Sequence, residues 1–202
     1  MQLSINIDKD FDRWQNADNW NKQFNMNKYI LKWELTGIVF VFLFGALLHF
    51  VFEWSNESRI VAAFASVNES VWEHFKQGFW PMCLYAALEF GFIRKHTNNF
   101  LSAKAVAVYV IPAVTALIFY AYTAIIGNEI LIVDILIFAV AITVGQLISY
   151  KIMTVDTLPK YANYVSLVFI LVLAIILILS TFYPPHLPIF LDETGFYGIP
   201  PH

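Results

Sequence analysis

The sequence predicts an all-α integral membrane protein: a bundle of five transmembrane helices with a cytoplasmic N-terminus and a C-terminus outside. Of its 202 residues, 59% are hydrophobic and only 13% are charged, whereas soluble domains carry about a quarter charged residues. The apolar residues also gather in runs long enough to cross a bilayer. The net charge of −3 and the lack of a basic stripe exclude a nucleic-acid partner. Membrane lipids are the expected surroundings.

Five apolar segments are predicted to span the membrane, because each offers about 20 mostly apolar residues. They cover residues 35–52, 71–93, 105–126, 130–150 and 164–183. The second segment is the least certain by hydropathy, since it is charged at both ends. The short Gly127-Asn128 turn predicts that the third and fourth segments are antiparallel neighbours. We expect a polar cytoplasmic extension at 1–27, one transmembrane domain at 28–183 and a Pro-rich tail outside the membrane at 184–202.

The orientation follows from the distribution of Lys and Arg, which favour cytoplasmic loops. Positive residues lie before the first span, after the second and after the fourth: Lys9, Arg13, Lys22, Lys28, Lys32; Arg94, Lys95, Lys104; Lys151, Lys160. The alternate segments are nearly free of positive charge, with Arg59 after the first span. This pattern places the N-terminus in the cytoplasm and the tail outside.

Ionisable residues of three predicted helices gather near the outer boundary. His49 and Glu53 are one helical turn apart, and Glu73 and Asp134 are expected at a similar depth. Imidazole and carboxylate groups so arranged are ligands for a divalent ion such as zinc. We therefore predict a metal site formed by His49, Glu53, Glu73 and Asp134. Five further residues could support it: Glu69, His74, Lys76, His186 and Asp192.

Structural interpretations of the same residues remain open. The sequence from Ser66 to Glu69 is a capping-box pattern, in which Glu69 would cap the second span. Glu73 and Lys76 are spaced for an ion pair at i,i+3. Asp134 has no cation on its own helix, so Lys76 or His74 is its natural partner. At the inner interface, Glu89 could pair with Arg94 or Lys151.

The tail, "YPPHLPIFLDETGFYGIPPH", is rich in proline and too apolar for a free segment. We expect it to fold back over the outer face as a lid, with His186 and Asp192 available to the cluster. The alternative is an apolar strap that lies on the membrane interface.

Several stretches resemble a known family: "KWELTG" at 32–37, "GALLHFVFEWS" at 45–55, "VNESVWEHFK" at 67–76, "DILIFAVAITVGQLISYKI" at 134–152 and "LPIFLDETGFYGI" at 187–199. They are similar to small bacterial and archaeal membrane proteins that are grouped as a domain of unknown function. The resemblance implies a polytopic protein of a bacterial or archaeal plasma membrane, and it implies no established activity.

Three functions are consistent with the sequence. The first is an outward-facing site for a divalent metal or a polar ligand, in transport or sensing. The second is a membrane-embedded, metal-dependent lipid hydrolase with Glu73 as general base. The third is a structural or accessory subunit whose outer polar network only fixes the packing of the helices. The partner would be a second copy or another membrane protein.

Overall fold

The computed structural model describes residues 7–200, with side chains described from residue 19 onward. The described chain is helical apart from its connections and its tail. The elements are α1 (Ile7–Trp54), α2 (Arg59–Ala62), α3 (Val71–Ile93), α4 (Phe100–Ile126), α5 (Leu131–Thr154), α6 (Tyr161–Phe182) and the 3₁₀ helix η1 (Pro188–Phe190). The all-α class is therefore confirmed.

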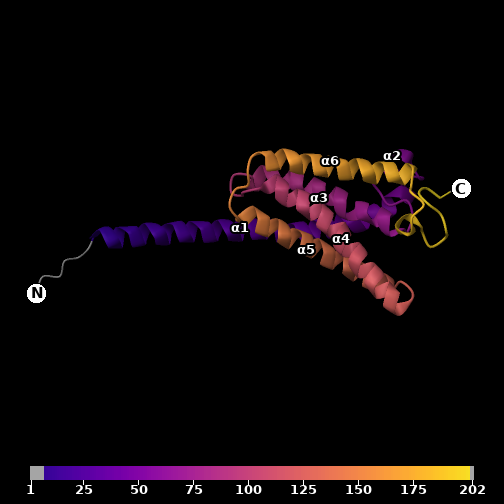
Figure 1. Ribbon diagram of the computed structural model, residues 1–202, viewed down its shortest axis with the longest axis horizontal. Helices are drawn as coiled ribbons and strands as arrows, with labels where there is room; N and C mark the ends of the chain where they lie inside the picture. Colours follow the sequence, from indigo (N-terminus) through magenta and orange to yellow (C-terminus); the bar gives the residue numbers. More distant parts are fainter. Residues whose placement is uncertain (1–6, 201–202) are drawn as a thin grey trace, which may run out of the picture.

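The four long helices α3, α4, α5 and α6 run alongside the C-terminal half of α1 (Figure 1). The N-terminal half of α1 projects beyond them, so residues 7–27 of the predicted extension continue the first span as one helix. α1 packs against α3 and α5, and α4 packs against α3, α5 and α6. The predicted antiparallel neighbours, α4 and α5, are confirmed; Gly127 lies between them with a positive φ of 88°.

Four helices are long and apolar enough to cross a membrane by length and composition. They are the Asn19–Trp54 part of α1, then α4, α5 and α6. Most of their apolar surface faces outward: only 22–28% of the residues in each apolar window are buried within the protein. Such a surface requires lipid. The chain is thus a multi-pass membrane protein.

Helix α3 forms over the predicted residues but does not meet the same criterion of apolar composition. Its charged side chains Glu73, Lys76 and Glu89 are buried inside the protein, with 0–2% of each exposed. Membrane proteins tolerate ionisable groups when these are buried against other helices and do not face lipid. The number of five crossings therefore remains a prediction, which depends on α3.

Apolar side chains of α3 form the centre of the bundle. Phe79 and Met82 are buried against Val41 of α1, Ile111 of α4 and Ile142 of α5. Close approach of the helices is possible because glycines lie at their contacts. A Cβ atom on Gly45 would meet the backbone oxygen of Gln77 at 2.5 Å, and small residues of this kind are typical of helix contacts in membranes.

The tail packs on the end of the bundle where α3 begins and α6 ends (Figure 1). Phe190 is buried against Trp72, with ring centroids 4.5 Å apart. Asn68 Nδ2 donates a hydrogen bond of 2.7 Å to the carbonyl of Gly198. The tail is thus attached to the polar segment that precedes α3.

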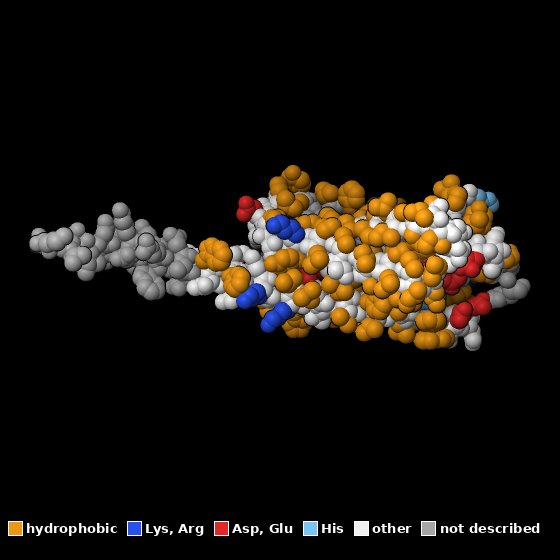
Figure 2. Space-filling view, turned by 90° about the horizontal axis from the view of Figure 1, so that it is seen from below, with side chains coloured by type: hydrophobic (Ala, Val, Ile, Leu, Met, Phe, Trp, Pro, Cys, Tyr) orange, Lys and Arg blue, Asp and Glu red, His pale blue; other side chains and the backbone are white. Residues whose placement is uncertain are grey.

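The two ends of the bundle differ in charge. On the face shown in Figure 2, apolar side chains cover the middle, and Lys and Arg lie at the end where α1 leaves the bundle. Acidic side chains concentrate at the opposite end, which carries the tail. We call this tail-bearing end the acidic end.

Candidate functional site

The segment before α3 sets the geometry of the acidic end. Ser70 is the N-cap of α3, and its hydroxyl accepts a hydrogen bond of 3.4 Å from the amide of Glu73. The amide of Ser70 in turn donates to Asn68 Oδ1 at 2.9 Å. The prediction that Glu69 caps this helix is therefore wrong. Because Ser70 already binds the free amide of the first turn, the Glu69 side chain is available for other contacts.

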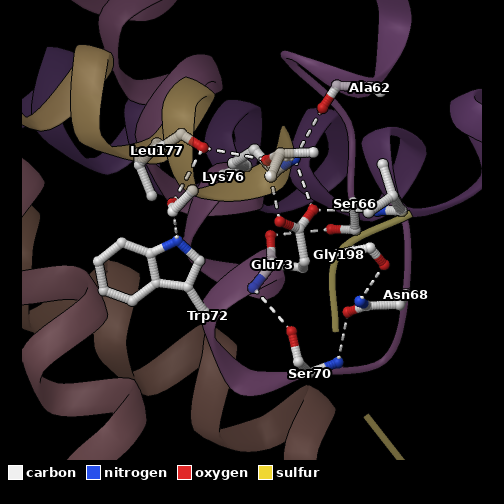
Figure 3. A network of polar contacts seen from close by, with 12 residues as sticks. Ala62, Ser66, Asn68, Ser70, Trp72, Glu73, Lys76, Leu177 and Gly198 are labelled. Atoms are coloured by element: carbon white, nitrogen blue, oxygen red, sulfur yellow. Dashed lines mark hydrogen bonds and ion pairs between the residues drawn. The ribbon is translucent and has the colours of Figure 1, made fainter. Parts of the chain in front are cut away.

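Glu73 and Lys76 form a buried ion pair, with 2.5 Å between Oε2 and Nζ (Figure 3). Lys76 also donates to the carbonyl of Ala62 and to Thr181 Oγ1, both at 2.8 Å. The Glu73 carboxylate accepts from the amide of Val67 at 3.1 Å and lies 3.0 Å from Thr181 Oγ1. The structure therefore confirms the structural interpretation of Glu73 and Lys76, an ion pair at i,i+3.

This pair connects three parts of the chain. Thr181 belongs to α6, Val67 and Ala62 belong to the segment between α1 and α3, and both charges are on α3. Trp72 adds a hydrogen bond of 2.6 Å to Ser180 of α6 (Figure 3). Every charge of the pair is met by an opposite charge and by hydrogen bonds, which is the condition under which buried ions are tolerated. Glu73 is thereby occupied with structural contacts.

A different group of residues faces the same end: His49, Glu69 and His74. Each offers one ligand atom, and these atoms lie within 4.8 Å of one another. Glu69 lies between the imidazoles, with Oε1 3.5 Å from His49 Nε2 and Oε2 3.5 Å from His74 Nε2. The two rings are 5.4 Å apart. Among the described residues, this is the group that could hold a metal ion.

Neighbouring groups orient both imidazoles. His74 Nδ1 lies 2.8 Å from the carbonyl of Ser70, which can only accept, so this nitrogen carries a proton and Nε2 faces Glu69. His49 Nδ1 lies 3.0 Å from Gln77 Nε2, and Gln77 also donates to Ser66 Oγ at 3.1 Å. With the amide so placed, His49 carries its proton on Nε2, toward Glu69. Hydrogen bonding to His74, with the charges of both imidazoles, holds the pKa of Glu69 below its usual value.

The remaining predicted ligands lie apart from this group. Glu53 is exposed and does not belong to it. Asp134 accepts a hydrogen bond of 2.5 Å from the hydroxyl of Tyr122, so its predicted partners Lys76 and His74 are wrong. Tyr122 is on α4, across the turn from Asp134. The sequence concealed this pair because a tyrosine carries no charge signal.

The tail residues also have contacts of their own. Asp192 Oδ1 accepts hydrogen bonds from the amides of Thr194 and Phe196, at 3.0 and 2.8 Å, which closes a turn within the tail. His186 packs against Tyr197 in a tilted arrangement, with ring centroids 4.7 Å apart. Neither residue is part of the group that could hold a metal. The prediction that they serve the cluster stays a prediction.

Further carboxylates lie at the same end of the bundle as the His49–Glu69–His74 group. Glu129 lies in the turn after α4 and shares a hydrogen bond with Glu193 of the tail. This contact, together with partial burial and the charges of Asp134 and Glu69, raises the pKa of Glu129 to about 7. The charges that act on Glu129 come from α5, from the tail and from the segment before α3, and like charges at one end of the bundle repel each other. Such a surface attracts cations.

A second polar cluster lies at the opposite end of the bundle, and the sequence analysis missed it. Lys104 of α4 contacts two carboxylates, Glu34 of α1 at 2.7 Å and Glu89 of α3 at 2.5 Å. The predicted partners of Glu89, Arg94 and Lys151, are therefore wrong. The distribution of positive charge places Lys104 in a loop, whereas α4 begins at Phe100 and buries it.

Comparison with protein families shows where the chain belongs. The model of a family of unknown function, DUF6512, matches residues 22–199. Searches of curated proteins and of solved structures found no match. The matched range includes all four membrane-capable helices from residue 22 onward, the acidic end and most of the tail. The chain therefore belongs to the family of unknown function DUF6512.

Proposed function

We propose that His49, Glu69 and His74 bind a divalent metal ion with the preferences of zinc, at the outer face of a multi-pass membrane protein. The observation that carries the proposal is the placement of three ligand atoms within 4.8 Å. Zinc takes His nitrogen and carboxylate oxygen at about 2.0–2.2 Å. Two ligand atoms bound to the same ion therefore lie only slightly closer to each other than the Glu69 oxygens lie to the imidazole nitrogens, which is 3.5 Å in each case.

The surroundings of the group support a cation as its ligand. Glu129, Asp134 and Glu193 add negative charge at the same end of the bundle, and they act on Glu69 or on each other. Lys76, a cation on the same helix as His74, is fully buried and paired with Glu73. A site with three protein ligands leaves a coordination position open, as in sites that exchange a ligand. Transport or sensing of the ion would use this position.

Metal binding at this group has to displace protons. In the contacts described above, His49 presents an N–H group to Glu69 through Nε2, whereas His74 carries a proton on Nδ1. A metal ion bound to Nε2 of both rings therefore requires a neutral His74 and a His49 that carries its proton on Nδ1. The Gln77 amide would then rotate so that its oxygen accepts from His49 Nδ1. Affinity should therefore fall as the pH is lowered, because protons compete with the ion.

The structural alternative is favoured by one observation, the complete pairing of Glu73 and Lys76. That network holds α3 against α6 and the segment between α1 and α3. It also removes the support for the lipid-hydrolase alternative, since Glu73, the required general base, is 2% exposed and occupied by Lys76. We infer that the acidic end contains a structural pair beside a binding group.

Zinc titration of the full-length protein in detergent, followed by calorimetry, tests the proposal. We expect one ion per chain, with binding lost in His74→Ala and Glu69→Gln. Glu53→Gln and His186→Ala are matched controls that should bind as the parent does, because neither residue belongs to the group. Gln77→Glu should tighten binding, since a carboxylate accepts from His49 Nδ1 without rotation.

Two results would contradict the metal proposal. One is a parent protein that is folded by circular dichroism and binds no zinc near neutral pH. The other is a folded His74→Ala variant that keeps its ion, since that would place the ion elsewhere. Loss of binding in Glu53→Gln would instead move the site toward the ligands that the sequence predicted.

A further inference from the structure

The polar cluster at the end of the bundle opposite the acidic end has two acids for one base. Glu34, Glu89 and Lys104 come from three different helices, and each is 0–2% exposed. Both carboxylates contact the same Lys104 nitrogen, at 2.7 and 2.5 Å, so they are close neighbours. The ring centroids of Tyr85 and Phe100 lie 5.9 and 5.5 Å from this nitrogen.

Several polar atoms of this cluster have no hydrogen-bond partner. They include Glu34 Oε2, Glu89 Oε1 and both atoms of the Gln146 amide. Gln146 is completely buried on α5 and packs against Gly37, one helical turn beyond Glu34, so closely that a Cβ atom on Gly37 would clash with its Nε2. The one further donor is Ser149, which bonds Glu34 Oε1 at 3.1 Å. Buried acceptors left in this state are costly.

The charges of the cluster do not balance when all three groups are ionised. Two carboxylates and one ammonium group leave one negative charge within the bundle. The titratable groups that face it are Glu34 on α1, Glu89 and Tyr85 on α3 and Lys104 on α4; α5 contributes only Gln146 and Ser149. Tyr85 donates its hydroxyl proton to the carbonyl of Trp33 at 2.5 Å, so it supplies no charge.

We propose that Glu34 and Glu89 form a proton-binding site, in which one proton is held between the two carboxylates beside Lys104. The proton removes the excess charge, and the O–H group it creates can donate to one of the oxygens that lack a partner. Binding and release of this proton change the charge of the bundle interior by one unit. The site is separate from the His49–Glu69–His74 group, since Glu34 and His49 are about 22 Å apart along α1.

Infrared difference spectroscopy of the full-length protein in detergent measures this proton directly, through the C=O stretching band of a buried carboxylic acid. We expect the band at neutral pH in the parent and its loss in both Glu34→Gln and Glu89→Gln. In each variant the single remaining carboxylate is balanced by Lys104 and stays ionised. Glu53→Gln, which changes an exposed acid, should keep the band.

Lys104→Met provides an independent check in case a glutamine variant does not fold. Without its cation, the cluster would hold two protonated carboxylic acids, and the band should rise to about twice its intensity. The proposal is overturned if the parent lacks the band at every pH at which it is folded, or if the band survives in both glutamine variants. Zinc binding by Glu34→Gln should be unchanged, so failure of either proposal leaves the other intact.

Discussion

At the scale of single residues, Lys76 shows how an expensive group becomes a structural one. Its ammonium group is completely buried, yet Glu73, Ala62 and Thr181 supply one partner for each of its three N–H donors. A lysine has three donors and no acceptor, so this arrangement uses its full capacity. The pair stabilises the fold because every donor of Lys76 has a partner. Variants that lack one partner should therefore be less stable.

Removal of Lys76 alone is therefore expected to be severe. Lys76→Met leaves the Glu73 carboxylate buried without a countercharge, and breaking such a pair costs about 3–5 kcal/mol. The double variant Glu73→Gln with Lys76→Met should recover a large part of this loss, because the oxygen of the introduced amide can still accept from Val67 and its nitrogen can donate to Thr181 Oγ1, which Lys76 no longer occupies. Denaturant unfolding in detergent measures both values, with the exposed Lys95→Met as control. A loss in Lys76→Met no larger than that in Lys95→Met would show that the pair contributes nothing.

At the scale of helices, the sequence predicts where each helix lies along the chain, but it does not predict which sides of the helices face each other. The predicted span 71–93 coincides with Val71–Ile93, and the other four predicted spans lie within or close to helices of the structure. Apolar run length and turn residues carry this information. Apart from α4 and α5, whose short turn makes them neighbours, the sequence does not show which helices are in contact, because α3 has polar residues on several faces. The contacts between α1, α3 and α4 that join Glu34, Glu89 and Lys104 therefore could not be predicted.

The glycines at helix contacts give a test of this packing. Gly45 lies where α1 meets α3, and a methyl group there would be 2.5 Å from the backbone oxygen of Gln77 and 2.6 Å from the Phe138 ring. Because backbone cannot move aside cheaply, Gly45→Ala should destabilise the bundle by about 1–3 kcal/mol. Gly91→Ala on α3 meets nothing within 4 Å and should be neutral or stabilising by up to about 1 kcal/mol. Equal stability of the two variants in thermal unfolding would contradict the close contact of α1 and α3.

At the scale of the whole molecule, the sequence predicts which residues gather at the acidic end, but not which of them form structural pairs and which face one another as possible ligands. The prediction that His49 and the residues around Glu73 share one end is reproduced by the structure. Two details decided the roles. Ser70, one residue after Glu69, is the helix cap, and this frees Glu69 to face two histidines. Lys76 turns inward to Glu73. A shift of one residue in a cap changes which acid reaches which partner, and a motif alone does not specify that.

The orientation of the chain and the crossing of α3 can be tested together. α3 begins near the end of α1 and ends near the start of α4, so its two flanks lie at opposite ends of the bundle (Figure 1). If α3 crosses the membrane, Arg59 and Lys95 lie on opposite sides, and the excess of Lys and Arg places Lys95 in the cytoplasm.

In a background with Cys83→Ala, a membrane-impermeant maleimide should label Arg59→Cys in intact cells. It should label Lys95→Cys only after permeabilisation, and Asn128→Cys, in the turn after α4, should behave as Arg59→Cys does. Labelling of Arg59→Cys and Lys95→Cys from one side, with Asn128→Cys labelled from the other, would show that α3 does not cross and would leave four spans. Reversed labelling would instead keep five spans, place the acidic end in the cytoplasm and make the His49–Glu69–His74 group a site for an intracellular ion.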